Sequence, residues 1–255
     1  MYRSRVIPCL LLKDQGLYKT IKFKNPRYLG DPINTLKLFN DKEADEIVVL
    51  DISASTNGRG PNFDYIKRLT RECFMPMCYG GGVTTLEQVE VLYKLGIEKV
   101  AFNTSLFTDP KLIKDAAKSF GSQSVVASID VKKGLLGSHS VHVMSGAKDT
   151  KFNPVAYAKR AEELGAGEIF INSIDKDGMM NGYDYDLIEK VSSAVNVPVV
   201  AIGGAGNLSD CVKAVKAGAS AASAGSLFVY YGSLKAVLIN YPTQDELAIS
   251  FSSGT

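Results

Sequence analysis

The sequence predicts an α/β protein, a single (βα)8 TIM barrel over residues 1–255. Three observations predict this fold. Eight short apolar runs alternate with amphipathic helical stretches. The runs are nearly continuous rather than alternating, which is typical of parallel strands that helices cover on both faces. The second half of the chain also repeats features of the first, so we expect two half-barrels, at about residues 1–121 and 122–240.

Each apolar run is expected to form one barrel strand. The runs cover residues 6–12, 46–52, 75–79, 99–103, 124–131, 168–174, 198–202 and 220–224. Eight such units in this length favour a closed barrel over a doubly wound sheet. A doubly wound sheet normally has an early G-x-G-x-x-G nucleotide fingerprint, and no such motif opens this chain.

Helices are expected between the strands from their start and stop signals. Asp31 before Pro32 is an N-cap followed by proline at the first helical position. Thr84 and Glu87 have the spacing of a capping box, and Gly96 is placed to end that helix. A second Asp-Pro pair starts a helix at residue 109. Further helices are expected over 154–164, 184–195 and 208–217.

The internal repeat has a spacing of about 122 residues. Aligning Gly82 with Gly204 also aligns Gly96 with Gly218, and strands two, three and four then match strands six, seven and eight. Three units in register are unlikely to arise by chance, so the repeat favours two half-barrels.

Composition narrows the classes of function. The chain is 45% hydrophobic with a net charge of +2, so we expect no nucleic-acid partner and no disordered tail. The first apolar run has only seven residues and is followed by Lys13, which indicates a strand rather than a signal peptide or membrane span. Four cysteines without a C-x-x-C pair suggest free thiols in a reducing cytoplasm. Only His139 and His142 are present, so we expect no metal site and no cofactor.

Glycine clusters follow corresponding strands in both halves and suggest two phosphate-binding sites. Glycine lets an anion approach the backbone, and helix N-termini offer free N–H groups. We call the two groups the first and the second cradle. The first contains Gly81, Gly82, Asn103 and Thr104, and the second contains Asp177, Gly178, Gly203, Gly204, Gly225 and Ser226. The alternative is that these glycines only turn the chain, but the duplication favours a phosphorylated ligand with a phosphate at each end.

The residues also carry a family resemblance. The stretches "RVIPCLLLKD", "YGGGV", "EKVAFNTS", "GAGEIFINSIDKDG", "AIGGAG" and "AGSLF" resemble the cyclase subunit of imidazole glycerol phosphate synthase, a glutamine amidotransferase. The resemblance implies a bisphosphorylated ribulosylformimino substrate and ammonia from a glutaminase subunit, bound as a heterodimer on the N-terminal barrel face. The products would be imidazole glycerol phosphate and aminoimidazole carboxamide ribonucleotide.

The resemblance further implies an ammonia gate at the N-terminal face. The matching positions are Arg5, Glu46, Lys99 and Glu168. Considered alone, charges at the start of apolar strands are either paired or simply solvent-exposed. The related histidine-pathway isomerase shares the half-barrel repeat but takes no ammonia, so this quartet argues against it.

One family position differs. The family uses an aspartate at the end of strand one and another at the end of strand five as acid and base. Asp130 matches the second, and Lys19 is also retained as a catalytic residue, but Leu11 stands at the first. Leucine cannot transfer a proton, and one positioned acid or base contributes about 10²–10⁴ in rate.

The leucine leaves two functions open. The stretches "RVIPCLLLKDQGLYKTIKFKNPRYLGDP" and "FNDKEADE" resemble a subgroup of the family that carries this change, the barrel proteins of bacterial surface-glycan clusters. The resemblance implies that the barrel passes ammonia to a separate sugar-amidating enzyme, and this function is favoured. The alternative is a histidine-biosynthesis cyclase. An unrelated phosphate-sugar isomerase is a third and weaker interpretation.

Overall fold

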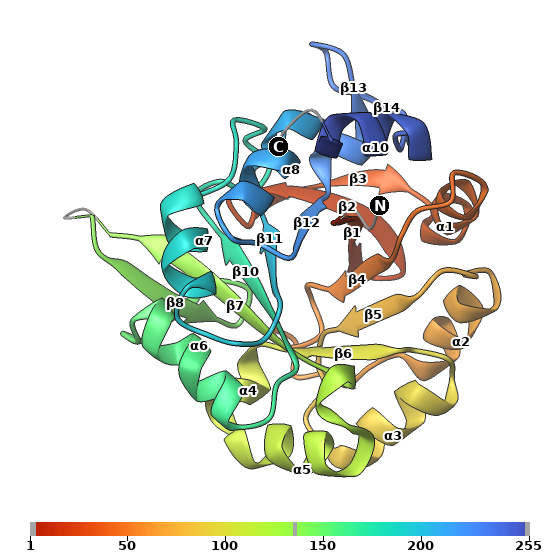
Figure 1. The fold of residues 1–255 in the computed structure, drawn as a ribbon. Coiled ribbons are helices and arrows are strands. Elements are labelled where there is room, and N and C mark those ends of the chain that lie inside the picture. The colour runs from red at the N-terminus through yellow and green to blue at the C-terminus, as the bar shows by residue number, and fades with distance from the viewer. Residues whose placement is uncertain (1–3, 135–136, 253–255) are drawn as a thin grey trace.

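The computed structural model describes residues 4–134 and 137–252, and its core is a closed barrel of eight parallel strands (Figure 1). The barrel strands are β1 (Arg5–Lys13), β4 (Ile47–Asp51), β5 (Met77–Gly80), β6 (Lys99–Phe102), β7 (Val125–Lys133), β10 (Glu168–Ser173), β11 (Val199–Ile202) and β12 (Ala221–Ala224). They pair in chain order, and β12 pairs with β1 to close the ring. The predicted fold is confirmed, and all eight predicted strands are present with ends within two residues of those expected.

Helices pack around the outside of the barrel, as Figure 1 shows. The longer ones are α1 (Pro32–Asp41), α2 (Phe63–Arg71), α3 (Leu86–Lys94), α5 (Pro110–Phe120), α6 (Pro154–Glu163), α7 (Tyr185–Ser192), α8 (Leu208–Lys216) and α10 (Gln244–Ser252). Short helices α4 (Thr104–Thr108) and α9 (Ser226–Val229) follow β6 and β12, and a 3-10 turn, η1 (Ser122–Ser124), precedes β7. No helix in the described part of the chain has the length and apolar character needed to cross a membrane.

Local sequence signals explain most helix starts. Asp31 caps α1, since its carboxylate accepts from the backbone N–H groups of the first turn. The capping box of α3 lies one residue later than predicted. Thr85, not Thr84, is the N-cap, and its partner is Gln88, not Glu87. Gln88 completes the capping box because its Oε1 accepts from the backbone N–H groups of Thr84 and Thr85, at 2.7 and 3.2 Å.

Three β-hairpins interrupt the (βα) pattern and were not predicted. The first is β2 (Gly16–Ile21) with β3 (Lys24–Gly30), the second β8 (His139–Val143) with β9 (Lys148–Asp149), and the third β13 (Tyr230–Tyr231) with β14 (Ala236–Val237). The first two follow the first and fifth barrel strands, β1 and β7, so they occupy corresponding places in the two halves of the barrel.

The elements themselves recur at the spacing seen in the sequence. Helix α3 begins at Leu86 and α8 at Leu208, while β6 begins at Lys99 and β12 at Ala221, so each pair is 122 residues apart. Either duplication of a half-barrel or convergence could give two halves with this 122-residue spacing. We propose duplication of a half-barrel.

The barrel has two apolar layers. One lies between the sheet and the helices, and the other fills the barrel interior. The interior cluster consists of Ile7, Cys9, Leu11, Val48, Cys78, Ala101, Val126, Phe170, Val200, Ile202 and Ala221. All four cysteines are free, and three are buried, which agrees with the thiols expected from the sequence.

Candidate functional site

The amino-terminal end of the barrel interior is closed by a ring of four charges, which we call the charged ring. Arg5 contacts Glu46 and Glu168, and Lys99 Nζ lies 2.9 Å from an oxygen of each carboxylate. Glu46 is 2% exposed and Glu168 4% exposed, so the two buried carboxylates need these cations to offset their loss of hydration. Burial alone would lower the pKa of Lys99, but attraction to Glu168 and Glu46 outweighs it and raises that pKa. The structure therefore brings together all four residues predicted for the gate.

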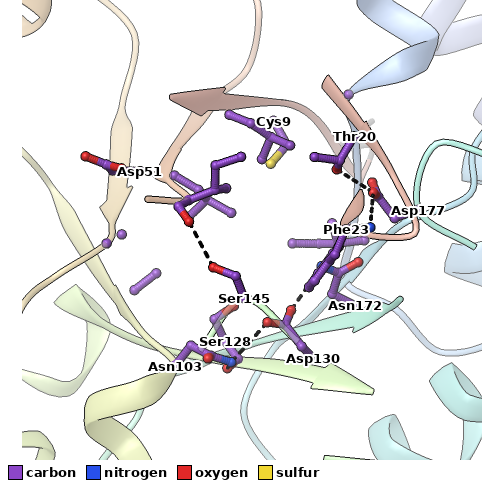
Figure 2. A pocket seen from close by; sticks show the side chains of 18 of the residues that line it. Cys9, Thr20, Phe23, Asp51, Asn103, Ser128, Asp130, Ser145, Asn172 and Asp177 are labelled. Atoms are coloured by element: carbon purple, nitrogen blue, oxygen red, sulfur yellow. Dashed lines mark hydrogen bonds between the residues drawn. The ribbon is translucent and has the colours of Figure 1, made fainter. Parts of the chain in front are cut away.

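A cavity of about 390 Å³ lies at the opposite, carboxyl-terminal end of the strands. Residues from all eight barrel strands line it, together with glycines of both cradles. Figure 2 shows polar side chains gathered along one side, with Asp130 between Asn103 and Asn172. This is the end at which barrel enzymes place their active sites.

Asp130 is the one lining carboxylate that neither caps a turn nor pairs with a cation in the described structure. Asn172 Nδ2 donates to its Oδ1 at 3.0 Å, and Asn103 Nδ2 donates to its Oδ2 at 3.2 Å. Burial raises its pKa to about 7, against the bond from Asn172, which lowers it. A carboxyl group that titrates near neutrality can give and take a proton in a reaction.

Asp51 and Asp177, the other aspartates of the cavity, are engaged in structural bonds. Asp51 Oδ1 accepts from the backbone N–H of Ser53 and Ala54, so it caps the turn after β4. Asp177 Oδ1 lies 2.6 Å from Lys19 Nζ, and both side chains are buried. Its Oδ2 accepts from Thr20 Oγ1 at 2.7 Å. Asp177 and Lys19, predicted for phosphate binding and catalysis, thus meet each other and fasten the β2–β3 hairpin to the loop after β10.

Leu11 lies where the strand-one acid was expected. It belongs to the apolar interior cluster, lines the cavity and is 8% exposed. It pairs with Leu50 of β4 on one side and with Tyr18 of β2 on the other. Leu11 and Leu50 therefore place an apolar patch in the cavity wall, with Asp51 at the next position along β4. Cys9 also lines the cavity, but burial raises the pKa of its thiol to about 12, which keeps it protonated and unsuited as a nucleophile.

The glycines of the first cradle are required by packing as well as by any ligand. A Cβ on Gly81 would lie 2.5 Å from the Asp51 carbonyl oxygen, and one on Gly82 would lie 2.3 Å from that of Arg59. Thr104 Oγ1 accepts from Met144 N at 3.1 Å, while the Asn103 amide is turned towards Asp130. The alternative given above, that these glycines serve only to turn the chain, thus explains part of the glycine cluster in the first cradle.

The glycines of the second cradle are packed as tightly as those of the first, since a Cβ on Gly204 would lie 2.3 Å from the Gly182 carbonyl oxygen. Gly203 and Gly204 adopt positive φ angles of 87° and 123°, which favour glycine. Gly178 also has a positive φ, and a Cβ there would lie 2.4 Å from the Thr20 carbonyl oxygen. Gly225 precedes α9, and the buried Ser226 Oγ has no hydrogen-bond partner among the described residues. Both cradles line the same cavity, as the repeat predicts.

Two of the three unpredicted hairpins, β2–β3 and β8–β9, meet over this cavity. A Cβ on Gly146, beyond β8, would lie 3.0 Å from the ring of Phe23, between β2 and β3. Ser145 Oγ donates to the Ile52 carbonyl oxygen at 3.0 Å, across the barrel mouth (Figure 2). Sequence reasoning missed Ser145 and Asn172. The two-residue alternation of inward side chains along β10, from Glu168 through Phe170, could have placed Asn172 in the interior.

Neither histidine marks a metal centre. His139 Nε2 lies 3.2 Å from Asp184, and His142 Nδ1 bonds the Gly146 carbonyl oxygen at 3.1 Å. Within residues 4–134 and 137–252, no group of three or more His, Cys, Asp or Glu side chains is arranged to hold a metal ion.

Comparison with known proteins gives consistent matches. Residues 5–235 match the family described as "Histidine biosynthesis protein". A Pseudomonas aeruginosa protein, provisionally named imidazole glycerol phosphate synthase subunit hisF2, is 52% identical over 98% of this chain and 100% of its own length. A provisionally named subunit HisF of Leptospira interrogans is 48% identical over 96% and 98% of the two chains. Imidazole glycerol phosphate synthase subunit HisF of Alkaliphilus metalliredigens is 42% identical over 90% and 92%.

Proposed function

The chain belongs to the histidine biosynthesis protein family, among the HisF-type cyclase subunits of imidazole glycerol phosphate synthase, and we propose that it receives ammonia through its barrel from a glutaminase subunit. The glutaminase would dock on the amino-terminal face, beside the charged ring. Arg5 is the most exposed member of this ring, with 34% of its side chain accessible, and would lie nearest to that partner.

The route through the barrel suits a small neutral molecule. Beyond the charged ring the interior is apolar, with Val48, Cys78, Ala101 and Val126 leading towards the cavity. An ammonium ion would lose its hydration there without gaining a counter-ion, whereas ammonia loses much less. The four charges of the ring are mutually paired, so ammonia passes only when a side chain of the ring moves.

The chemistry at the carboxyl-terminal end sets this chain apart, and Leu11 is the observation that carries the proposal. Asp130 can serve as one acid or base. The group expected opposite it is an alkyl side chain, Asp51 caps a turn, and Asp177 is paired with Lys19. A cyclisation that needs two carboxyl groups thus lacks one of them. We propose that ammonia is passed onward to a separate sugar-amidating enzyme, for amidination of a surface-glycan sugar.

The second candidate is cyclisation in histidine biosynthesis. It is favoured by Asp130, whose pKa near 7 suits proton transfer, and by the retention of Lys19 at the second cradle. Under either function we propose that the two cradles bind a ligand with two phosphate groups. The unpartnered Ser226 Oγ and the position of both cradles in the wall of one cavity support this part of the proposal.

One experiment separates the two candidates. The purified chain is given the bisphosphorylated histidine-pathway intermediate with excess ammonium at alkaline pH, and loss of its absorbance is followed. Leu11→Asp is measured alongside. We expect wild type to be inactive and the variant to gain turnover, by about 10²–10⁴ for the restored group. Wild-type turnover close to that of the variant would instead establish the histidine-pathway cyclase.

A further inference from the structure

Exposed apolar side chains gather on two of the hairpins. Of the ten large apolar side chains that are exposed in the described part of the chain, six lie within residues 16–30 and 230–238, which comprise the β2–β3 hairpin and the β13–β14 hairpin with the residue after it. Leu234, in the turn between β13 and β14, is 93% exposed, Tyr231 is 65% exposed and Tyr28 of β3 is 59% exposed. A single exposed apolar residue is ordinary, but a cluster of them marks a surface that binds another molecule.

The two hairpins form one continuous surface, which we call the hairpin surface. The Arg27 guanidinium of β3 lies over the ring of Tyr230 at the start of β13, 5.9 Å from its centroid. Pro26, the residue before Arg27, lines the cavity, so the surface begins at the rim of the barrel mouth. From there it extends outward along β13–β14, which project beyond the rest of the ribbon (Figure 1).

The hairpin surface is basic and its two segments contain no acidic residue. They carry five of the 29 Lys and Arg residues of the chain and none of the 27 Asp and Glu residues. Four of these cations lie outside the cavity lining, namely Lys22, Lys24, Arg27 and Lys235. The nearest acids in the sequence, Asp14 and Asp31, are engaged, one with Arg59 and the other as the cap of α1. The opposite charge must therefore come from a partner.

Charge and shape favour a partner protein other than a second copy of this chain. Two copies would set cations against cations, and Pro26 interrupts the open edge of β3, a device that keeps sheet edges from pairing with themselves. An anionic membrane has the right charge but is flat, whereas this surface steps from β3 to a projecting hairpin (Figure 1). Tyr and Arg side chains are also enriched in protein–protein interfaces.

We propose that the hairpin surface docks an acidic face of the enzyme that accepts the ammonia. This inference rests on the proposed transfer of ammonia to a separate sugar-amidating enzyme. Ammonia that leaves the cavity into water is diluted and protonated, and the ammonium ion has no lone pair with which to attack. An acceptor anchored on the hairpins lies beside the rim at Pro26, so it takes up ammonia before the ammonia reaches bulk solvent.

The position of the acceptor is tested by photo-crosslinking in the cells that produce the chain. The photoreactive residue benzoylphenylalanine is placed at Tyr231, at Tyr28 or, as the control, at Lys114 of α5, a helix across the barrel from β13–β14 (Figure 1). We expect both tyrosine positions to give an adduct with one protein that amidates an N-acetyl sugar when ammonium is supplied, and Lys114 to give almost none of it. No adduct, or adducts only with a second copy, with lipid or with a protein lacking this activity, would overturn the docking site.

The role of the surface is tested by the delivery of ammonia. An extract of cells that lack this chain is supplemented with wild type, with the double variant Lys24→Glu, Lys235→Glu or with the matched control Lys111→Glu, Lys114→Glu on α5. Transfer of isotopically labelled amide nitrogen from glutamine to the amidino sugar is followed by mass spectrometry. We expect the double variant to lose about tenfold or more of this transfer and the control less than about twofold, while amidination from added ammonium stays the same in all three.

The two proposals fail in different ways. If the double variant delivers glutamine nitrogen as well as wild type does, the docking surface is overturned while the transfer of ammonia stands. If wild type delivers no glutamine nitrogen although added ammonium is used, the proposed transfer is overturned, and the docking inference falls with it.

Discussion

The charged ring provides the sharpest prediction about stability, through the substitution Glu168→Gln. Glu168 accepts from Arg5 at 2.5 Å and from Lys99 at 2.9 Å, and it is 4% exposed. The amide keeps the shape of the side chain but removes its charge. Two cations then share Glu46 alone, so the ring has an uncompensated positive charge.

The magnitude follows from how deeply these charges lie. Breaking a buried ion pair costs about 3–5 kcal/mol when one partner is left alone. Here Lys99 is 18% exposed and Arg5 34% exposed, so water offsets part of the loss, and we expect about 2–4 kcal/mol. For a chain of this size that corresponds to a fall in Tm of about 5–12 °C.

The assay is thermal and urea unfolding of three proteins beside wild type. Glu90→Gln is the matched control, because Glu90 pairs with Lys94 on the exposed surface of α3, and it should cost less than about 0.5 kcal/mol. The double variant Lys99→Met, Glu168→Leu restores neutrality and should regain at least half of the lost stability. The reasoning would be refuted if Glu168→Gln were as stable as the Glu90→Gln control. It would also be refuted if the double variant were less stable than Glu168→Gln.

Three further predictions concern the cavity and its surroundings. Because the native pKa of Asp130, about 7, lies above its unfolded value near 3.9, its ionisation lowers stability as pH rises through this interval. The Tm of Asp130→Asn relative to wild type should therefore increase between pH 5 and pH 8, by the equivalent of about 2–3 kcal/mol, and a constant difference would contradict the assigned pKa. Asp177→Ala should release the β2–β3 hairpin and speed its cleavage by trypsin at least tenfold, whereas Asp186→Ala, which breaks an exposed pair, should not. A thiol reagent should label Cys73 alone in the native protein, slowly because burial raises its pKa to about 11, and all four cysteines in urea; prompt labelling of a second thiol would show that the core opens.

The barrel was predictable because burial on both faces leaves little choice of residues. A strand such as β11 (Val199–Ile202) has every residue buried, and this appears in the sequence as a short apolar run. The β2–β3 hairpin gives no such signal. Its turn places Lys22 and Phe23 at positive φ angles of 52° and 61° without the glycine or asparagine that usually indicates such a turn.

The site was predictable where backbone geometry dictates the residue and not where tertiary contacts do. Glycines with positive φ, such as Gly203, are visible in the sequence and indicated the cradles. The Lys19–Asp177 pair joins residues 158 positions apart, and only the closed barrel brings them together. Asn172 appears in the sequence as one polar residue at a strand end, and only the fold shows that its amide donates to the Asp130 carboxylate.

If the barrel arose by the half-barrel duplication proposed above, the charged ring shows where the two halves differ. Glu46 and Glu168 are 122 residues apart and occupy equivalent places, whereas Lys99 corresponds to Ala221, and the fifth strand, β7, starts with two valines where β1 starts with Arg5. A strictly symmetric ring would set four cations against two carboxylates and could not be buried at reasonable cost. Because only the first half carries cations here, the ring has two charges of each sign. The two halves of the barrel thus differ at the charged ring, where identical halves would have buried an excess of positive charge.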